Sequence, residues 1–234
     1  MGNFFGLALA GLLLSSLSSS APPTGLDRLL ARLQAAGKEG ANSEEARAAW
    51  REAVATRDAE QFVFVDESGT HTALTRLYGW APHDQRATGS VPRNHGKNTT
   101  LVVALTPDGL QAPWLIEGAM NTETFAWYIT EELAPLLRPG QIVVLDNLSA
   151  HKAACIRAAL AARQCELLFL PPYSPDCTPI EQAFSKIKAL LRGLGARTKD
   201  ALQEAVRLAI EAITHEDAVA WFAHAGYALP DQRT

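Results

Sequence analysis

The sequence has few cysteines, little net charge and one long apolar run. Its three cysteines are Cys155, Cys165 and Cys177. An odd number without a CxxC pair argues against a disulfide framework and against a zinc site. Reduced thiols in a cytoplasmic protein are the simplest interpretation. The sequence therefore points away from small secreted folds and zinc modules.

The formal net charge is -4, from 21 Lys and Arg against 25 Asp and Glu. The chain as a whole thus carries no basic signal for nucleic acid, and any contact with DNA must come from local patches. Residues 4–17 are apolar, but no Lys or Arg occurs before Arg28, so the basic start of a secretory signal is missing. The run also falls short of the roughly 20 residues that span a bilayer. We expect neither export nor a membrane contact.

What is present indicates one α/β domain behind an extension. Residues 1–42 form an atypical N-terminal extension, apolar and then rich in Ser, Pro and Gly. Residues 43–60 predict a linker helix, with Ser43 as its N-cap and two glutamates in the first turn. Residues 61–234 have the pattern of a compact α/β domain. The composition, 47% hydrophobic and 20% charged, is typical of globular proteins.

Periodicity within the domain predicts a mixed five-stranded sheet flanked by helices. The expected strands are 62–65, 73–80, 99–105, 142–145 and 166–170. The expected helices are 122–137, 149–163, 179–191, 198–213 and 215–224. Consecutive strands followed by strand–helix–strand units predict an antiparallel meander extended by parallel strands, with the first and fourth strands as neighbours.

Three acidic residues would converge in such a sheet. Asp66 and Asp146 follow the first and fourth strands, and Glu181 opens the helix after a proline-rich loop. Carboxylates that converge repel one another unless cations neutralise them, and hard Mg²⁺ or Mn²⁺ ions suit oxygen ligands. Two ions roughly 3.5–4 Å apart would clamp the attacking and leaving oxygens of a phosphoryl transfer.

Each carboxylate also has a purely structural interpretation. Asp66, in Asp-Glu-Ser-Gly, would form a turn, and Asp146 would merely end a strand. Glu181 would complete a capping box with Thr178 as N-cap and Pro179 at the first helical position. Taken singly, these interpretations are at least as good as the functional one. Their common placement at connected ends of one sheet favours the metal site.

Three segments carry a family resemblance. Residues 65–69, 145–152 and 170–182 are similar to the signature blocks of bacterial insertion-sequence transposases (insertion sequence 630 / mariner superfamily). The spacing between Asp146 and Glu181, residues 147 to 180, also matches, and Thr178 stands where the family commonly has Asn. The resemblance covers about residues 45–234. It implies a ribonuclease-H-like fold with Asp66, Asp146 and Glu181 as the Asp-Asp-Glu triad.

The resemblance also implies an activity and its partners. Similar transposases use two Mg²⁺ ions, with Mn²⁺ as a substitute, to cleave DNA strands and transfer them during transposition. Their partners are double-stranded DNA, as transposon ends and target, and a second copy in a homodimer. They act in the bacterial cytoplasm, at the nucleoid. Because they carry helix-turn-helix modules that the 65 residues before Asp66 leave little room for, we expect a truncated or frame-split chain that cannot select DNA ends by itself.

Candidate DNA contacts lie near these blocks. Asn147 and His151 follow Asp146 closely and would orient a carboxylate or touch a phosphate, although a residue at the start of a helix is the preferred interpretation of His151. Two stretches that hold basic but no acidic residues would bind phosphates, or be solvated surfaces. They contain Arg86, Arg93, His95 and Lys97 in the first, and Lys186, Lys188, Arg192, Arg197 and Lys199 in the second.

Two other functions stay open. The first is a ribonuclease-H-like nuclease without strand transfer, which would share the fold and metals. The second is a catalytically silent DNA-binding remnant of a transposase. A haloacid-dehalogenase-type phosphatase is excluded more firmly, because its Asp-x-Asp would need an aspartate where Ser68 stands.

Overall fold

The computed structural model describes residues 43–227 and Leu229, so the expected extension, 1–42, lies outside the described residues. A five-stranded mixed sheet forms the centre, in the order β3-β2-β1-β4-β5. The first three strands form an antiparallel meander, and the last two extend it in parallel. Their bounds are β1 Phe62–Thr70, β2 Thr99–Thr106, β3 Gly109–Glu117, β4 Ile142–Leu145 and β5 Glu166–Phe169. The predicted architecture and the adjacency of first and fourth strands are confirmed.

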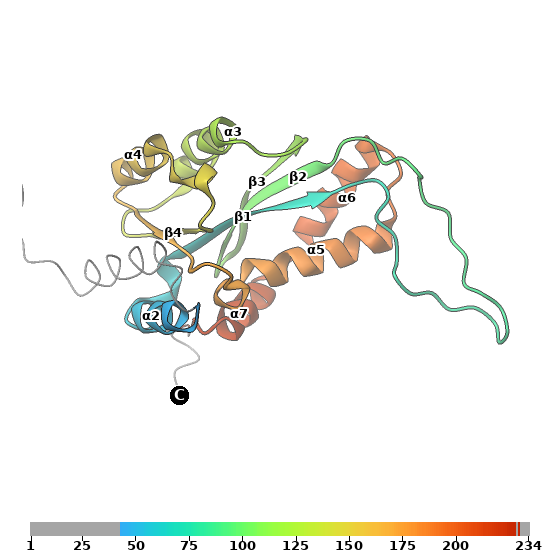
Figure 1. Ribbon diagram of the computed structural model, residues 1–234, viewed down its shortest axis with the longest axis horizontal. Helices are drawn as coiled ribbons and strands as arrows, with labels where there is room; N and C mark the ends of the chain where they lie inside the picture. Colours follow the sequence, from blue (N-terminus) through green and yellow to red (C-terminus); the bar gives the residue numbers. More distant parts are fainter. Residues whose placement is uncertain (1–42, 228, 230–234) are drawn as a thin grey trace, which may run out of the picture.

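Helices cover both faces of this sheet (Figure 1). One face carries α3, continued by a π-helix and a 3-10 turn, and α4; the other carries α2, α5, α6 and α7. None of the helices in the described part of the chain is long and apolar enough to cross a membrane. Their bounds are α2 Ser43–Ala55, α3 Thr122–Trp127, α4 Ala154–Ala162, α5 Ile180–Leu194, α6 Lys199–Glu211 and α7 His215–His224.

The start of β1 shows why two layers of helices are needed. Phe62 and Phe64 pack with α2, α5, α6 and α7, whereas Val63 and Val65 pack with α3 and α4. Alternate side chains of a strand point to opposite faces, so a strand that is apolar at every position must be covered twice. Each of these side chains is at most 2% exposed, and such burial stabilises by about 1.5–3 kcal/mol per residue.

One predicted strand is absent from the structure, and one strand was not predicted. Residues 73–80 contain no strand and belong to a long segment, 71–98, that projects from the body between β1 and β2 (Figure 1). Tyr78 is 91% exposed and Trp80 fully so, which shows that the large apolar residues at 77–80 are not core. The third strand is β3 instead, which the sequence did not indicate because Pro113 interrupts it. Pro113 is tolerated there because β3 is an edge strand.

The turn predicted at Asp66–Gly69 is also wrong, because β1 continues through it to Thr70. Beyond Asp66 the strand pairs with β2 alone, Glu67 with Val102 and Ser68 with Leu101. Its parallel neighbour β4 ends at Leu145. Asp66 therefore lies within a strand, at the level where its neighbour stops.

Candidate active site

The parallel pairing of β1 and β4 brings two aspartates side by side. Phe64 pairs with Val144, and two residues further along the chain from each are Asp66, within β1, and Asp146, immediately after the end of β4. Neighbouring strands lie about 4.8 Å apart, and residues separated by two point to the same face. Both carboxylates consequently leave the sheet at the carboxyl end of β4, where α/β sheets place their ligands.

Glu181 reaches the same place from α5. The proline-rich loop ends in a 3-10 turn, Pro175–Cys177, and α5 begins immediately after Pro179 with Glu181 in its first turn. No side-chain hydrogen bond caps this end of the helix, and the Thr178 hydroxyl is buried without a partner among the described residues. The predicted capping box is therefore not formed, and Glu181 is exposed towards the pocket described next.

One pocket of about 450 Å³ collects all three carboxylates. Its other walls come from the segment after β4 and from the loop between β5 and α5. Most of that wall is apolar or backbone, so the pocket offers acidic groups on one side and a hydrophobic wall on the other. Its lining consists of Asp66, Asp146, Asn147, Leu148, Leu170, Pro171, Pro172, Tyr173, Ser174, Pro175, Thr178 and Glu181.

The pocket concentrates negative charge. Burial raises the pKa of the Asp66 carboxyl to about 7. The charges of Asp146, Glu181 and Glu67 push this pKa in the same direction, and only the Glu67 N–H, which donates to Asp66 Oδ1 at 2.7 Å, opposes them. A cation in the pocket would relieve this repulsion.

His151 lies behind Asp146 and not at the surface. It is 1% exposed, its Nδ1 is 2.5 Å from Asp146 Oδ1, and its Nε2 is 3.2 Å from Glu67 Oε1. Its ring stacks on Phe125 with 3.9 Å between centroids. Burial lowers the pKa of His151, but the two carboxylates outweigh burial and raise it to about 9. The imidazolium thus neutralises and orients two acidic groups, and the predicted contact of His151 with DNA does not fit this burial.

The donor set suits a hard divalent cation. All three residues offer anionic oxygens, which Mg²⁺ and Mn²⁺ prefer. Among residues 43–227 and Leu229, no three His, Cys, Asp or Glu side chains lie close enough to enclose one ion. Carboxylates that repel one another stand apart in this way, and a shared ion would draw them together. The anionic oxygens of Asp66, Asp146 and Glu181, which line one pocket, therefore fit a divalent cation in their chemistry.

The basic residues of α5 divide into two groups. Lys186 forms an ion pair with Asp217 of α7. Lys188 and Arg192 form no ion pair with another described residue. Because an α-helix has 3.6 residues per turn, positions 181, 188 and 192 share one face. Lys188 and Arg192 thus extend from Glu181 along α5 as a line of positive charge.

The other predicted DNA contacts lie in two separate places. Asn147 lines the pocket and is half-buried. Arg86, Arg93, His95 and Lys97 are all exposed in the projecting 71–98 segment, and none lines the pocket.

Sequence reasoning missed several residues of the site. Glu67 was overlooked although it directly follows Asp66, because its partner His151 is 84 residues away in sequence. Tyr173, 89% exposed at the pocket rim, was overlooked as part of a rigid loop. The adjacency of Glu67 to the first acidic residue was the one available signal.

Two comparisons give relatives for this chain. The sequence profile described as DDE superfamily endonuclease matches residues 61–203, a segment that contains all three pocket carboxylates. No curated protein matches the sequence.

Solved structures share the fold. The Mos1 transposase paired-end complex with left transposon end aligns over 96% of this chain and 63% of that chain, with 18% identity and a TM-score of 0.59. The mariner Mos1 paired-end complex with Mg aligns over 99% and 65%, with 18% identity and a TM-score of 0.56. The catalytic domain of Mos1 mariner transposase aligns over 86% and 89%, with 16% identity and a TM-score of 0.51. The chain thus spans less than two thirds of the transposase in the complexes. The expected ribonuclease-H-like fold is confirmed.

Proposed function

Because the chain belongs to the DDE superfamily endonucleases, we propose that it cleaves DNA strands and transfers them during transposition, with Asp66, Asp146 and Glu181 as its catalytic residues. The observation that carries this proposal is the convergence of the three carboxylates on one pocket. They come from β1, from the end of β4 and from the start of α5, which are separate parts of the chain. Acidic residues that served only to form turns, end strands or cap helices would not be expected to line one pocket.

The three carboxylates would hold two Mg²⁺ ions, or Mn²⁺ in their place. Structures of Mos1 transposase complexes with Mg and with Mn support this choice of metal. Bound here, such ions supply activation of an attacking oxygen and stabilisation of the charge that develops on the phosphodiester. With that chemistry, no covalent enzyme intermediate is needed.

The other residues would prepare the carboxylates and the DNA. His151 fixes Asp146 and Glu67 from behind, as outer partners commonly do for metal ligands. Lys188 and Arg192 would follow the phosphate backbone away from Glu181. The proposed partner is double-stranded DNA, both as transposon end and as target. The expected homodimer stays a prediction.

The test is a plasmid assay with the full chain. Supercoiled plasmid incubated with Mg²⁺ or Mn²⁺ should become nicked or linear, and Asp146→Ala should abolish the conversion. Wild-type protein that leaves the plasmid intact with either metal, or a variant that cuts as well as wild type, would contradict the proposal.

A joining assay then separates transposase from nuclease. A labelled duplex with a free 3'-hydroxyl should become linked to the plasmid. Cleavage without any linked product would identify a ribonuclease-H-like nuclease instead.

A further inference from the structure

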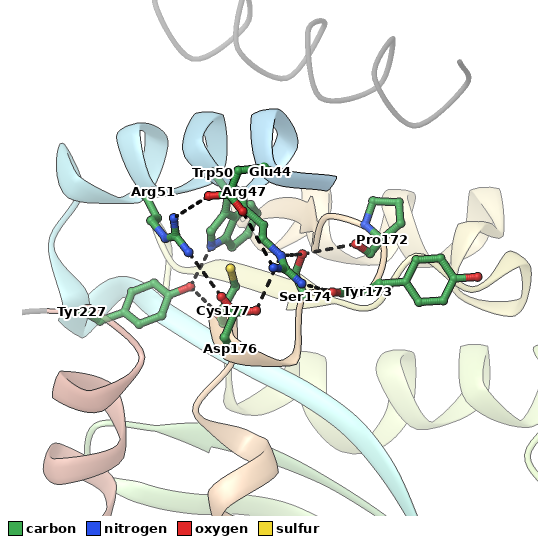
Figure 2. Close-up of polar contacts among 10 residues, drawn as sticks. All are labelled: Glu44, Arg47, Trp50, Arg51, Pro172, Tyr173, Ser174, Asp176, Cys177 and Tyr227. Atoms are coloured by element: carbon green, nitrogen blue, oxygen red, sulfur yellow. Dashed lines mark hydrogen bonds and ion pairs between the residues drawn. The ribbon is translucent and has the colours of Figure 1, made fainter. Parts of the chain in front are cut away.

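Helix α2 lies outside the matched segment, 61–203, yet it contacts a wall of the pocket. Figure 2 shows side chains of α2 pointing onto the loop that joins β5 to α5. This loop lines the pocket and leads directly into the helix that carries Glu181. Three sets of contacts fasten it.

Arg47 holds the backbone of the loop. Its Nη2 donates to the Tyr173 carbonyl oxygen at 2.5 Å, and its Nε donates to Ser174 Oγ at 3.3 Å. Ser174 Oγ in turn donates to the Pro172 carbonyl oxygen at 3.2 Å. Tyr173 has a φ of +55°, a left-handed conformation that a bulky residue rarely adopts unless its surroundings impose it. Arg47 supplies that constraint, because it binds the carbonyl of the strained residue itself.

Arg51 adds a charge contact one turn further along α2. Its Nη2 lies 3.3 Å from Asp176 Oδ2, while Arg47 Nε lies 3.6 Å from Asp176 Oδ1. Glu44 in turn pairs with both arginines. Exposed ion pairs contribute little to stability one by one. Their effect here is to fix where the 3-10 turn before α5 lies.

A buried contact fastens the same turn from the other side. Trp50 Nε1 donates to the Tyr227 hydroxyl at 3.0 Å, and that hydroxyl donates to the Cys177 carbonyl oxygen at 2.8 Å. All three residues are at most 3% exposed. Cys177 is only four residues before Glu181, so the backbone leading to the carboxylate is tied to α2 and to Tyr227, which follows α7.

We propose that α2, together with Tyr227, positions the metal site: Arg47, Arg51 and Tyr227 hold residues 173–177 so that Glu181 faces the pocket that Asp66 and Asp146 line. The inference rests on the proposed function, since it assumes that these carboxylates share divalent ions. None of the three positioning residues lies among the residues that line the pocket, so they act on it only through the loop.

The experiment measures Mn²⁺ binding to the full chain by calorimetry. Arg47→Ala, Asp176→Asn and Tyr227→Phe should each weaken binding about tenfold, the range seen when outer partners of metal ligands are removed. Tyr227→Phe keeps the ring and removes only the hydroxyl, so it tests the bond to Cys177 in a fold that should survive. Arg57→Ala is the matched control, because Arg57 pairs with Glu166 at 3.2 Å and does not touch the loop.

Two further measurements separate positioning from plain stability. Arg47→Ala and Arg57→Ala should lower the unfolding temperature alike, but only the former should change Mn²⁺ affinity. Arg47→Lys should restore little, since an ammonium cannot make both loop contacts of the guanidinium. In the plasmid assay, the positioning variants should need more metal for half-maximal cleavage and approach the wild-type rate at saturating metal.

The outcomes distinguish a failure of the positioning role from a failure of the metal site itself. If Asp146→Asn abolishes Mn²⁺ binding but Arg47→Ala, Asp176→Asn and Tyr227→Phe bind as tightly as wild type, the positioning role is wrong and the metal site stands. If wild type binds no Mn²⁺, or Asp146→Asn binds equally well, the metal site fails and this inference falls with it.

Discussion

Asp66 in β1 and Asp146, the first residue after β4, occupy equivalent positions, each two residues beyond the paired Phe64 and Val144. Backbone pairing alone thus fixes their proximity, independently of any side-chain contact. Two carboxylates that the sheet places side by side are suited to holding a cation between their oxygens.

The first prediction follows from that pair. Asp146→Asn should weaken Mn²⁺ binding at least tenfold, because an amide oxygen lacks the charge that a hard cation prefers. Titration calorimetry of both proteins measures the difference. Asp108→Asn, an exposed aspartate in the turn between β2 and β3, controls for a general loss of charge. Equal affinity in Asp146→Asn would contradict the assignment.

A second prediction concerns stability without metal. The folded-state pKa of Asp66, about 7, lies above its ordinary value of 3.8, so folding favours the protonated carboxyl. That stabilisation is complete below pH 3.8 and is lost as the pH rises through 7. With a chelator present at pH 8, Asp66→Asn should therefore be more stable than wild type by on the order of 2 kcal/mol. Urea unfolding at pH 8 and pH 4 measures this, and the difference should shrink at the lower pH.

Glu181→Gln should separate catalysis from folding. No capping bond exists at the start of α5, so the change should alter the free energy of unfolding by less than about 0.5 kcal/mol. Cleavage should fall more than about 100-fold, beyond the effect of removing an outer partner of a metal ligand. Glu204→Gln, on the exposed side of α6, is the control. A large loss of stability with cleavage retained would return Glu181 to a structural role.

The face of α5 beyond Glu181 should bind phosphates. Changing both Lys188 and Arg192 to Ala should weaken binding to any duplex and reduce the slope of log affinity against log salt by about 2. Arg207→Ala is the control. It removes one positive charge from α6, where Arg207 pairs with Glu204 and Glu211. Lys186→Ala should matter less than either change, because Asp217 already neutralises Lys186. An unchanged slope in the double variant would mean that this face of α5 is exposed to solvent and does not bind phosphates.

The sheet could be predicted from sequence where burial alone decides the conformation. Residues 142–145 are apolar on both faces and form β4 as predicted. Asp-Glu-Ser-Gly has the composition of a turn, but pairing with β2 overrides it, and such pairing depends on residues more than thirty positions away. Residues 73–80 have the composition of a strand, yet they form none, because no strand of the described residues lies beside them to pair with.

The sequence predicted which carboxylates form the candidate site, but not which other side chains hold them and the loop beside them in place. The spacing of Asp66, Asp146 and Glu181 pointed to one place, and the three line one pocket. The burial of His151 and the contacts of Arg47 could not be foreseen, because their partners lie 84 and 126 residues away. Contacts of that kind leave no local pattern in the sequence.

The aromatic cluster around Tyr227 sets the minimum length of a useful fragment. Phe62 and Phe64 of β1 lie 5.1 and 5.0 Å from the Tyr227 ring, and Phe222 lies 5.5 Å from Phe64. A recombinant fragment cut at the limits of the matched segment, 61 and 203, would keep every pocket carboxylate and lose Trp50, Phe222 and Tyr227. The face of its sheet that α5 covers would then be partly open to water, because α2, α7 and most of α6 would be missing, and such a fragment should aggregate before its chemistry could be measured.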